Sequence, residues 1–315
     1  MSHVKVQHRG VSADGVYKGL LAAAAALVFV VVALIVYEVA RGAELSIRTI
    51  GWKFLTQTEW DPVADKYGAL PYIYGTLVSS LLALLIAVPL GVGSAVFLAE
   101  IASRRVGSIV SFVMELLAAI PSIVYGIWGF FVLAPFLRVF IEPWLIEHFG
   151  FLPLFRGFPF GIGMLNAGII LAIMIVPTIV SISREVLLAT PPTFREASLA
   201  LGATKAEAIG VALDAARPGI LGAIILALGR ALGETMAVTM VIGNTNRISL
   251  SLLDPGATMS SIIANEFTEA TGKLYLSALV QIALVLFAVT IVVNAMARAL
   301  VYWATGGRRD VAGAA

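Results

Sequence analysis

The sequence contains no cysteine and only three histidines. The lack of cysteine excludes disulfide bonds, thiolate metal sites and cysteine nucleophiles. The histidines lie far apart, and none shares a predicted helix face with a carboxylate at metal-ligand spacing. We therefore predict no metal site and no catalytic residue.

Charged residues are also scarce. They make up 13% of the 315 residues, and hydrophobic residues make up 60%, whereas soluble domains have about 25% charged and about 45–50% apolar residues. The net charge of +2 is small and scattered, which argues against a nucleic-acid partner. A chain with so much apolar surface is expected to lie in membrane lipid.

Sequence motifs of common enzymes are missing as well. There is no G-x-x-x-x-G-K-[ST] loop, so the chain cannot bind ATP in the manner of P-loop proteins. There is also no H-E-x-x-H zinc motif and no G-x-S-x-G nucleophile motif. These absences argue against an enzyme, and we expect the chain itself to bind no cofactor.

Long apolar stretches are the dominant positive feature. A helix needs about 20 mostly apolar residues to cross a membrane, and the sequence offers about six such stretches. Pro89, Pro121 and Pro177 fall inside them and should kink or break those helices, which is tolerated where neighbouring helices satisfy the freed backbone groups. We predict an all-α membrane protein with spans near residues 19–40, 72–99, 106–133, 157–183, 218–243 and 274–303.

The segments between the spans define the layout. Residues 1–18 and 304–315 form tails, residues 41–70 form an outer loop, and residues 71–303 form one transmembrane domain with a polar loop at 184–217. Lysine and arginine are slightly more frequent in the tails and in that loop, and such residues collect in the cytoplasm. We expect both termini to be cytoplasmic.

The loop at 184–217 is too polar to cross the membrane and too regular to be unstructured. Thr193, with Glu196 three residues later, predicts a capped helix start. Gly202 interrupts the helix, Asp214 is a plausible stop, and Pro218 suits the opening turn of the next span. The pattern alone is compatible with two interpretations. The loop could be a surface that another protein binds, or it could be an interfacial helix that lies on lipid, and the pattern favours neither.

Charged residues occur inside the fifth predicted span. Arg230 and Glu234 are four residues apart and should share a helix face. Intramembrane charges face a bundle interior or a wet pathway, so the two form either a structural ion pair or a pathway on which Arg230 meets an oxyanion. Gly229 and Gly233 have the G-x-x-x-G spacing of close helix packing. Glu115, in the third span, is expected at the cytoplasmic interface.

The motif Glu196-Ala197-Ser198, followed by Gly202, resembles the EAA loop of binding-protein-dependent permeases of ATP-binding cassette importers. In that family the loop forms a coupling helix that docks on a cytoplasmic ATPase. The resemblance implies that Arg195, Glu196, Ala197 and Gly202 couple this chain to such an ATPase. Asp214 stands where the family has a proline.

A second run, GRALGETMAVTMVIGN at 229–244, resembles the permeases of high-affinity phosphate importers, as does the run at 259–265. This resemblance covers residues 70–303. It implies the type I importer fold in a bacterial cytoplasmic membrane, with Arg230 and Glu234 on the path of inorganic phosphate. It also implies three kinds of partner: a companion permease, two copies of an ATP-binding subunit that uses ATP and Mg²⁺, and an extracytoplasmic phosphate-binding protein.

Two alternatives remain at this point. A permease for another oxyanion, such as sulfate or molybdate, would have the same architecture, because an arginine does not distinguish phosphate from sulfate. A secondary transporter or channel would work without an ATPase, and the loop at 184–217 would then have no purpose.

Overall fold

The structure, a computed structural model, describes residues 11–304, and this part of the chain is helical with only two isolated β-bridges. The elements are α1 (Val11–Ile50), α2 (Lys53–Thr56), α3 (Leu70–Val96), η1 (Phe97–Ile101), α4 (Arg104–Ala119), α5 (Ser122–Trp128), η2 (Gly129–Leu133), α6 (Ala134–Phe136), η3 (Leu137–Ile141), α7 (Glu142–Phe149), η4 (Pro153–Phe155), α8 (Met164–Ala189), α9 (Thr193–Ala200), α10 (Lys205–Leu232), α11 (Met236–Val241), α12 (Met259–Glu266) and α13 (Lys273–Ala304).

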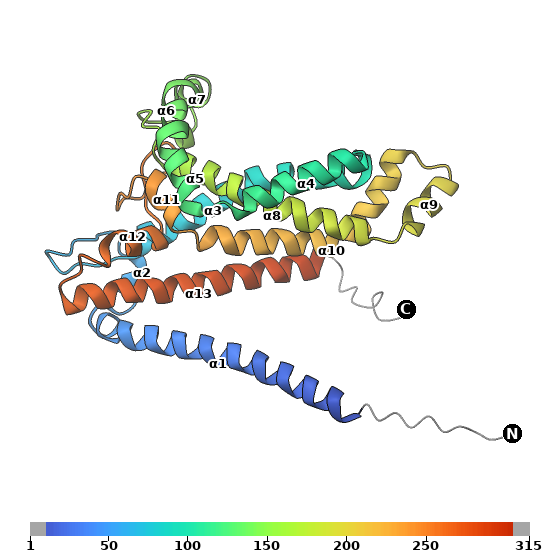
Figure 1. The fold of residues 1–315 in the computed structure, drawn as a ribbon. Coiled ribbons are helices and arrows are strands. Elements are labelled where there is room, and N and C mark those ends of the chain that lie inside the picture. The colour runs from blue at the N-terminus through green and yellow to red at the C-terminus, as the bar shows by residue number, and fades with distance from the viewer. Residues whose placement is uncertain (1–10, 305–315) are drawn as a thin grey trace.

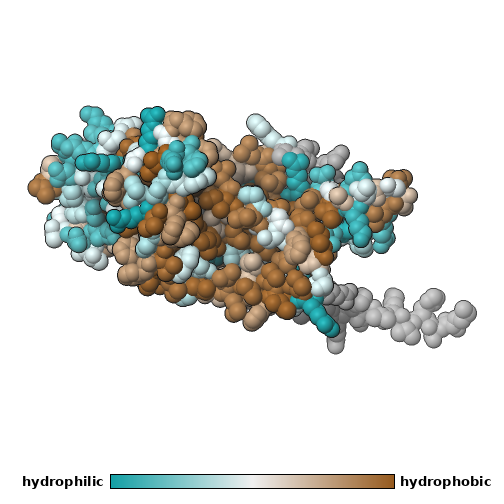
Figure 2. Space-filling model, turned by 90° about the horizontal axis from the view of Figure 1, so that it is seen from above, coloured by the Kyte–Doolittle hydropathy of each residue, from teal (hydrophilic) through white to brown (hydrophobic). Residues whose placement is uncertain are grey.

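Six segments of the described chain are long and apolar enough to cross a membrane: Gly15–Ile50, Leu70–Ile101, Ser122–Phe149, Met164–Ala189, Lys205–Leu232 and Lys273–Trp303. In Figure 1 most of the long helices run alongside one another. Figure 2 shows a wide hydrophobic zone between hydrophilic residues at the two ends of the molecule. The prediction of an all-α membrane protein with about six spans is confirmed.

Small residues let the central helices approach closely. A Cβ added at Gly91 of α3 would lie 2.7 Å from the Ile179 side chain of α8, and one at Gly168 of α8 would lie 2.5 Å from Leu82 of α3. Such close approach favours helix association in lipid, where packing replaces the hydrophobic effect. The contact between α3 and α8 therefore forms the centre of the core.

An aromatic cluster closes the end of the bundle opposite α9. Trp60 contacts Tyr67 and Tyr72 edge to face. Glu266 of α12 accepts hydrogen bonds from Trp60 Nε1 at 2.7 Å and from the Tyr275 hydroxyl at 2.6 Å. These contacts fix the segment before α3 against α12 and α13.

The first helix is longer than the predicted span at 19–40. It continues to Ile50, and an ion pair between Glu44 and Arg48, four residues apart, stabilises the extension. The outer loop predicted from residue 41 therefore begins later. Near this end α1 attaches to α13, because Ser277 Oγ donates to the Gly42 carbonyl and receives a hydrogen bond from Ser46 N.

The third span was predicted over residues 106–133, with Pro121 as a point where the helix kinks or breaks. The break occurs, but the predicted bounds of the span are wrong. Ile120 has extended backbone angles between α4 and α5. Pro121 explains the break, because proline disfavours helical geometry in the residue before it. In Figure 1, α4 lies along α8, whereas α5 to α7 turn away from the direction of the bundle. The apolar segment of spanning length is Ser122–Phe149.

The fourth span also differs from its predicted bounds of 157–183. Gly157 and Gly161 have φ values of +130° and +75°, which keep this part of the chain out of the helix, and α8 begins at Met164. The helix then continues through Arg184 to Ala189. The charge of Arg184 therefore does not end the helix.

Three sequence signals around the loop at 184–217 misplaced the helix ends. Thr193 is the first residue of α9 and not its cap. The capping box lies at Thr204, whose hydroxyl accepts from Glu207 N. From there α10 runs without interruption through Asp214 and Pro218 to Leu232. The predicted stop at Asp214 and the predicted span at 218–243 are therefore wrong.

Candidate functional site

The fifth span breaks at the charged residues. The helix α10 ends at Leu232 and the short helix α11 begins at Met236, so Glu234 lies between two helices. The predicted shared helix face of Arg230 and Glu234 is therefore wrong. Broken helices in membrane transporters form substrate sites, because their free backbone groups and side chains line a cavity.

Glu234 is held in the break by its neighbours. Its Oε1 atom accepts a hydrogen bond from Ala237 N at 3.3 Å, which caps the start of α11. Its backbone oxygen accepts from the Ser260 hydroxyl of α12 at 2.7 Å. The carboxylate is thus positioned by α11 and α12, and it makes no ion pair with Arg230 in the described chain.

Arg230 lies in the last turn of α10, where a positive charge interacts favourably with the helix dipole. The side chain is half-buried, and the described residues offer it neither an ion pair nor a hydrogen bond. Its charge is close enough to interact with Tyr125 of α5. The donors of the guanidinium group are therefore available to an oxyanion, which arginine binds with two parallel hydrogen bonds.

The two glycines beside these charges have open surroundings. A Cβ added at Gly229 would meet only Asn294 of α13, at 3.9 Å, and one at Gly233 would meet only the Gly229 carbonyl, at 3.7 Å. Within the described chain, the close helix packing predicted from their G-x-x-x-G spacing does not occur. Packing against another subunit stays a prediction.

The loop at 184–217 forms a helix, a turn and a second helix, as the pattern suggested. Gly202 ends the first helix with φ of +88°, which glycine adopts without strain. Glu196 and Ala197 are exposed on α9, and beside them Leu201 is 90% exposed and Phe194 is 42% exposed. A groove of Phe194, Ala197, Leu201 and Val211 borders this apolar surface. We call these exposed residues of α9 and the adjoining turn the α9 surface.

Arg195 does not belong to the α9 surface. Its Nε donates to Glu100 Oε2 of η1 at 3.0 Å, and its guanidinium also donates to the carbonyls of Thr190 and Leu187 at 3.1 and 3.0 Å. The Arg195 side chain is 22% exposed and that of Glu100 is 9% exposed. Arg195 therefore attaches α9 to η1 and to the end of α8, and this geometry does not fit its predicted contact with an ATPase.

Two residues of these sites were missed from the sequence. In the sequence, Glu100 only follows the span predicted at 72–99, and Ser260 is only one member of the run at 259–265. Neither has a periodic signal, because Glu100 meets Arg195 across 95 residues and Ser260 meets Glu234 across 26 residues. A lone carboxylate at the end of a span was the one available hint that Glu100 needs a basic partner.

Comparison with known proteins identifies relatives over almost the whole chain. Residues 87–304 match the family described as "Binding-protein-dependent transport system inner membrane component". The phosphate transport system permease protein PstC of Mesorhizobium japonicum is 48% identical over 90% of this chain and 89% of its own length. PstC of Haemophilus influenzae is 44% identical, with coverage of 91% and 93%.

A solved structure supports the fold. A chain in the crystal structure of a bacterial alginate ABC transporter, in complex with its alginate-bound periplasmic protein, matches 93% of this chain and 97% of its own length with a TM-score of 0.61. The sequence identity of 16% makes this a likeness of fold alone. By the match over residues 87–304 and the identity of 48%, the chain belongs to the binding-protein-dependent transport system inner membrane component family and, within it, to the PstC permeases.

Proposed function

We propose that this chain passes inorganic phosphate across the cytoplasmic membrane as the permease subunit of an importer driven by a separate ATPase. The relatives that support this substrate are named phosphate transport permeases and are 44–48% identical over about nine tenths of the chain. The structural observation that carries the proposal is the unpaired guanidinium of Arg230 beside the break in the fifth span. Sulfate and molybdate permeases are not favoured by these relatives.

Arg230 and Glu234 have different roles at the break in the fifth span. The Arg230 side chain, without an internal partner, offers planar donors that bind two oxygens of a phosphate ion. Glu234 is tied to α11 and α12, so it supplies a fixed negative charge that limits how long the anion stays near Arg230. Weak binding of this kind suits transport, because an ion must leave its site as readily as it enters.

The partners follow from the family and from the α9 surface. We propose a PstA-like companion permease, two copies of a PstB-like ATP-binding subunit that use ATP and Mg²⁺, and a PstS-like extracytoplasmic phosphate-binding protein. The exposed Phe194 and Leu201 support the ATPase contact, because apolar side chains at a hydrophilic end of the molecule are typical of a docking surface. This chain contributes the path, and the ATP-binding subunit carries out the hydrolysis.

The orientation in the membrane is part of the same proposal. The beginning of α1, the end of α13 and α9 lie at one end of the molecule (Figure 1). If α9 meets a cytoplasmic ATPase, the beginning of α1 and the end of α13 also lie on the cytoplasmic side, whereas the predicted tails reach beyond the described residues. The aromatic cluster around Trp60 then lies at the outer face.

The test is uptake of radiolabelled phosphate into cells that lack their own high-affinity permease, with this chain, its companion and the ATPase restored. We expect ATP-dependent uptake that unlabelled sulfate and molybdate do not inhibit.

Arg230→Gln should abolish phosphate uptake although the variant reaches the membrane in normal amounts, because the amide lacks the charge. The matched control is Arg298→Gln, at the exposed cytoplasmic end of α13. Normal uptake by Arg230→Gln would remove Arg230 from the mechanism, and competition by sulfate would change the substrate.

A further inference from the structure

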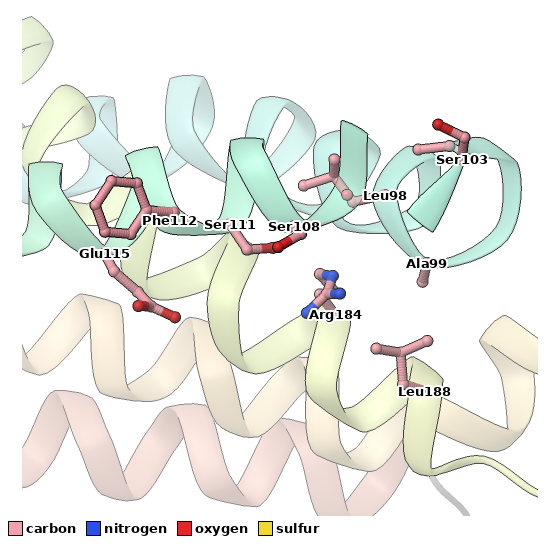
Figure 3. A pocket seen from close by; sticks show the side chains of 11 residues that line it. Leu98, Ala99, Ser103, Ser108, Ser111, Phe112, Glu115, Arg184 and Leu188 are labelled. Atoms are coloured by element: carbon pink, nitrogen blue, oxygen red, sulfur yellow. The ribbon is translucent and has the colours of Figure 1, made fainter. Parts of the chain in front are cut away.

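A cavity lies between α4 and α8, at the end of the bundle that carries α9. Its volume is about 540 Å³, and its lining combines serines, one arginine and one glutamate with apolar side chains. In Figure 3, Arg184 of α8 is directed toward Ser108 and Ser111 of α4, and Glu115 lies at one end of the cavity. The cavity shares no residue with the Arg230 site or with the α9 surface.

The polar side chains of α4 form one stripe along the helix. Ser108, Ser111 and Glu115 follow one another at intervals of three and four residues, which places them on one face. Residues on other faces of the same helix, such as Ile109 and Val113, are exposed and apolar. The helix thus turns a polar stripe toward Arg184 (Figure 3).

Two polar atoms in this cavity are buried without a partner. Arg184 Nε and Ser111 Oγ have no hydrogen bond, and Arg184 makes no ion pair with any described residue. A buried polar atom without a partner is unfavourable and rare in native proteins. The guanidinium group can only donate hydrogen bonds, so the missing partner of Arg184 Nε is an acceptor, and the Ser111 hydroxyl can donate to an acceptor as well.

We propose that this cavity binds a phosphate-type oxyanion, with the guanidinium of Arg184 and the hydroxyls of Ser108 and Ser111 as donors to its oxygens. Arginine suits this ligand because its planar fork matches two oxygens of a phosphate group. The carboxylate of Glu115, at the far end, repels the anion and keeps it near Arg184. The inference goes beyond the proposed role of Arg230, because it rests on the cavity alone and stands if that role fails.

Two sources offer this chemistry at the cytoplasmic end of the protein. One is inorganic phosphate on its way out of the permease. The other is the headgroup of an anionic lipid, whose chains would contact the apolar Leu98, Phe112 and Leu188 of the lining. The two sources differ in where the ligand comes from, which makes them separable by experiment.

The test is the rate at which phenylglyoxal, a reagent for arginine, modifies Arg184 in the assembled complex, read by mass spectrometry of its peptides. The complex is placed in phosphatidylcholine nanodiscs with and without inorganic phosphate, and in nanodiscs containing phosphatidylglycerol without phosphate. Arg105 is the control in the same samples, because it is exposed on α4 and does not line the cavity. Ligand at about nine times its Kd should slow modification of Arg184 by about tenfold.

Protection by inorganic phosphate in neutral lipid supports a site for the free ion, and protection by phosphatidylglycerol alone supports a lipid site. Ser111→Ala should weaken the protection, and Glu115→Gln should strengthen it by removing the negative charge. Equal rates of Arg184 modification in all three samples would overturn the proposal. Equal protection of Arg184 and Arg105 would also overturn it, as would protection of Arg184 that is the same in Ser111→Ala, Glu115→Gln and the wild type. If Arg230→Gln stops phosphate uptake but Arg184 is still protected from modification, the cavity binds its ligand independently of Arg230.

Discussion

The ion pair between Arg195 and Glu100 should decide whether α9 is held in position. The pair is largely buried, and Arg195 also donates to two backbone carbonyls at the end of α8. Removing one partner of a buried pair costs about 3–5 kcal/mol, because the other charge is left uncompensated. Arg195→Ala leaves the Glu100 carboxylate in this state, so the docked position of α9 loses its main polar support.

The effect should appear in binding of the ATPase, although Arg195 does not lie on the α9 surface. If only docked α9 binds the ATPase, a loss of about 3 kcal/mol weakens that binding by up to about 100-fold. The assay is titration of the ATPase against the purified permease pair in nanodiscs. Glu100→Gln should have a smaller effect, since a neutral amide still accepts a hydrogen bond from Arg195, and the matched control is Arg217→Gln, exposed on α10.

The double variant Glu100→Gln with Arg195→Ala isolates the interaction. Residues in contact give non-additive effects, and Glu100→Gln removes the charge that Arg195→Ala leaves uncompensated, so the double variant should bind the ATPase more tightly than Arg195→Ala alone. Wild-type ATPase affinity in Arg195→Ala would refute the reasoning, and so would fully additive losses in the double variant.

Three further predictions concern the turn, the core and the outer cluster. Gly202→Val should reduce the amount of ATPase that co-purifies with the permease, and Gly202→Asn should reduce it less. The reason is that φ of +88° costs roughly 1–2 kcal/mol for ordinary residues but is tolerated by asparagine. Equal amounts of co-purified ATPase with both variants would contradict this. Gly168→Leu should lower the thermal stability of the purified permease, because a Cβ there meets Leu82 at 2.5 Å, whereas Gly93→Ala, with nothing within 4 Å, should not. Burial and the hydrogen bond to Asp65 raise the pKa of Tyr67 to about 12. The contribution of Tyr67 to the stability of the folded protein should therefore be complete below about pH 10 and fall as the pH rises toward 12. Tyr67→Phe should flatten the profile of thermal stability against pH in this range.

The sequence predicted the helical class and the approximate spans because apolar length is a strong signal. The ends of the helices were less predictable, and the errors have identifiable causes. Asp214 and Pro218 signal a boundary locally, but the capping box at Thr204 starts α10 earlier. Ala208, Ala212 and Ala216 are then buried along one face, and this packing holds the helix together across both residues.

The candidate site was predicted in its residues but not in its geometry. Four-residue spacing places Arg230 and Glu234 on one face only if the helix continues, and no local signal other than Gly233 indicates the break. The break depends on contacts from elsewhere in the chain, such as the hydrogen bond from Ser260 to the Glu234 backbone. For the same reason the cavity at Arg184 was not foreseen, since its residues come from α4 and α8 and meet only in the folded chain.

The uninterrupted course of α10 has a mechanical consequence. The helix has 28 residues, so at 1.5 Å per residue it is about 42 Å long. One end carries the capping box beside the α9 surface, and the other end carries Arg230 at the break in the fifth span. A helix broken at Asp214 would separate these ends by a flexible joint. The observed α10 instead connects them directly, with Pro218 as the position where a bend is expected. We therefore expect a displacement of α9 to be passed to the guanidinium of Arg230 through a single helix.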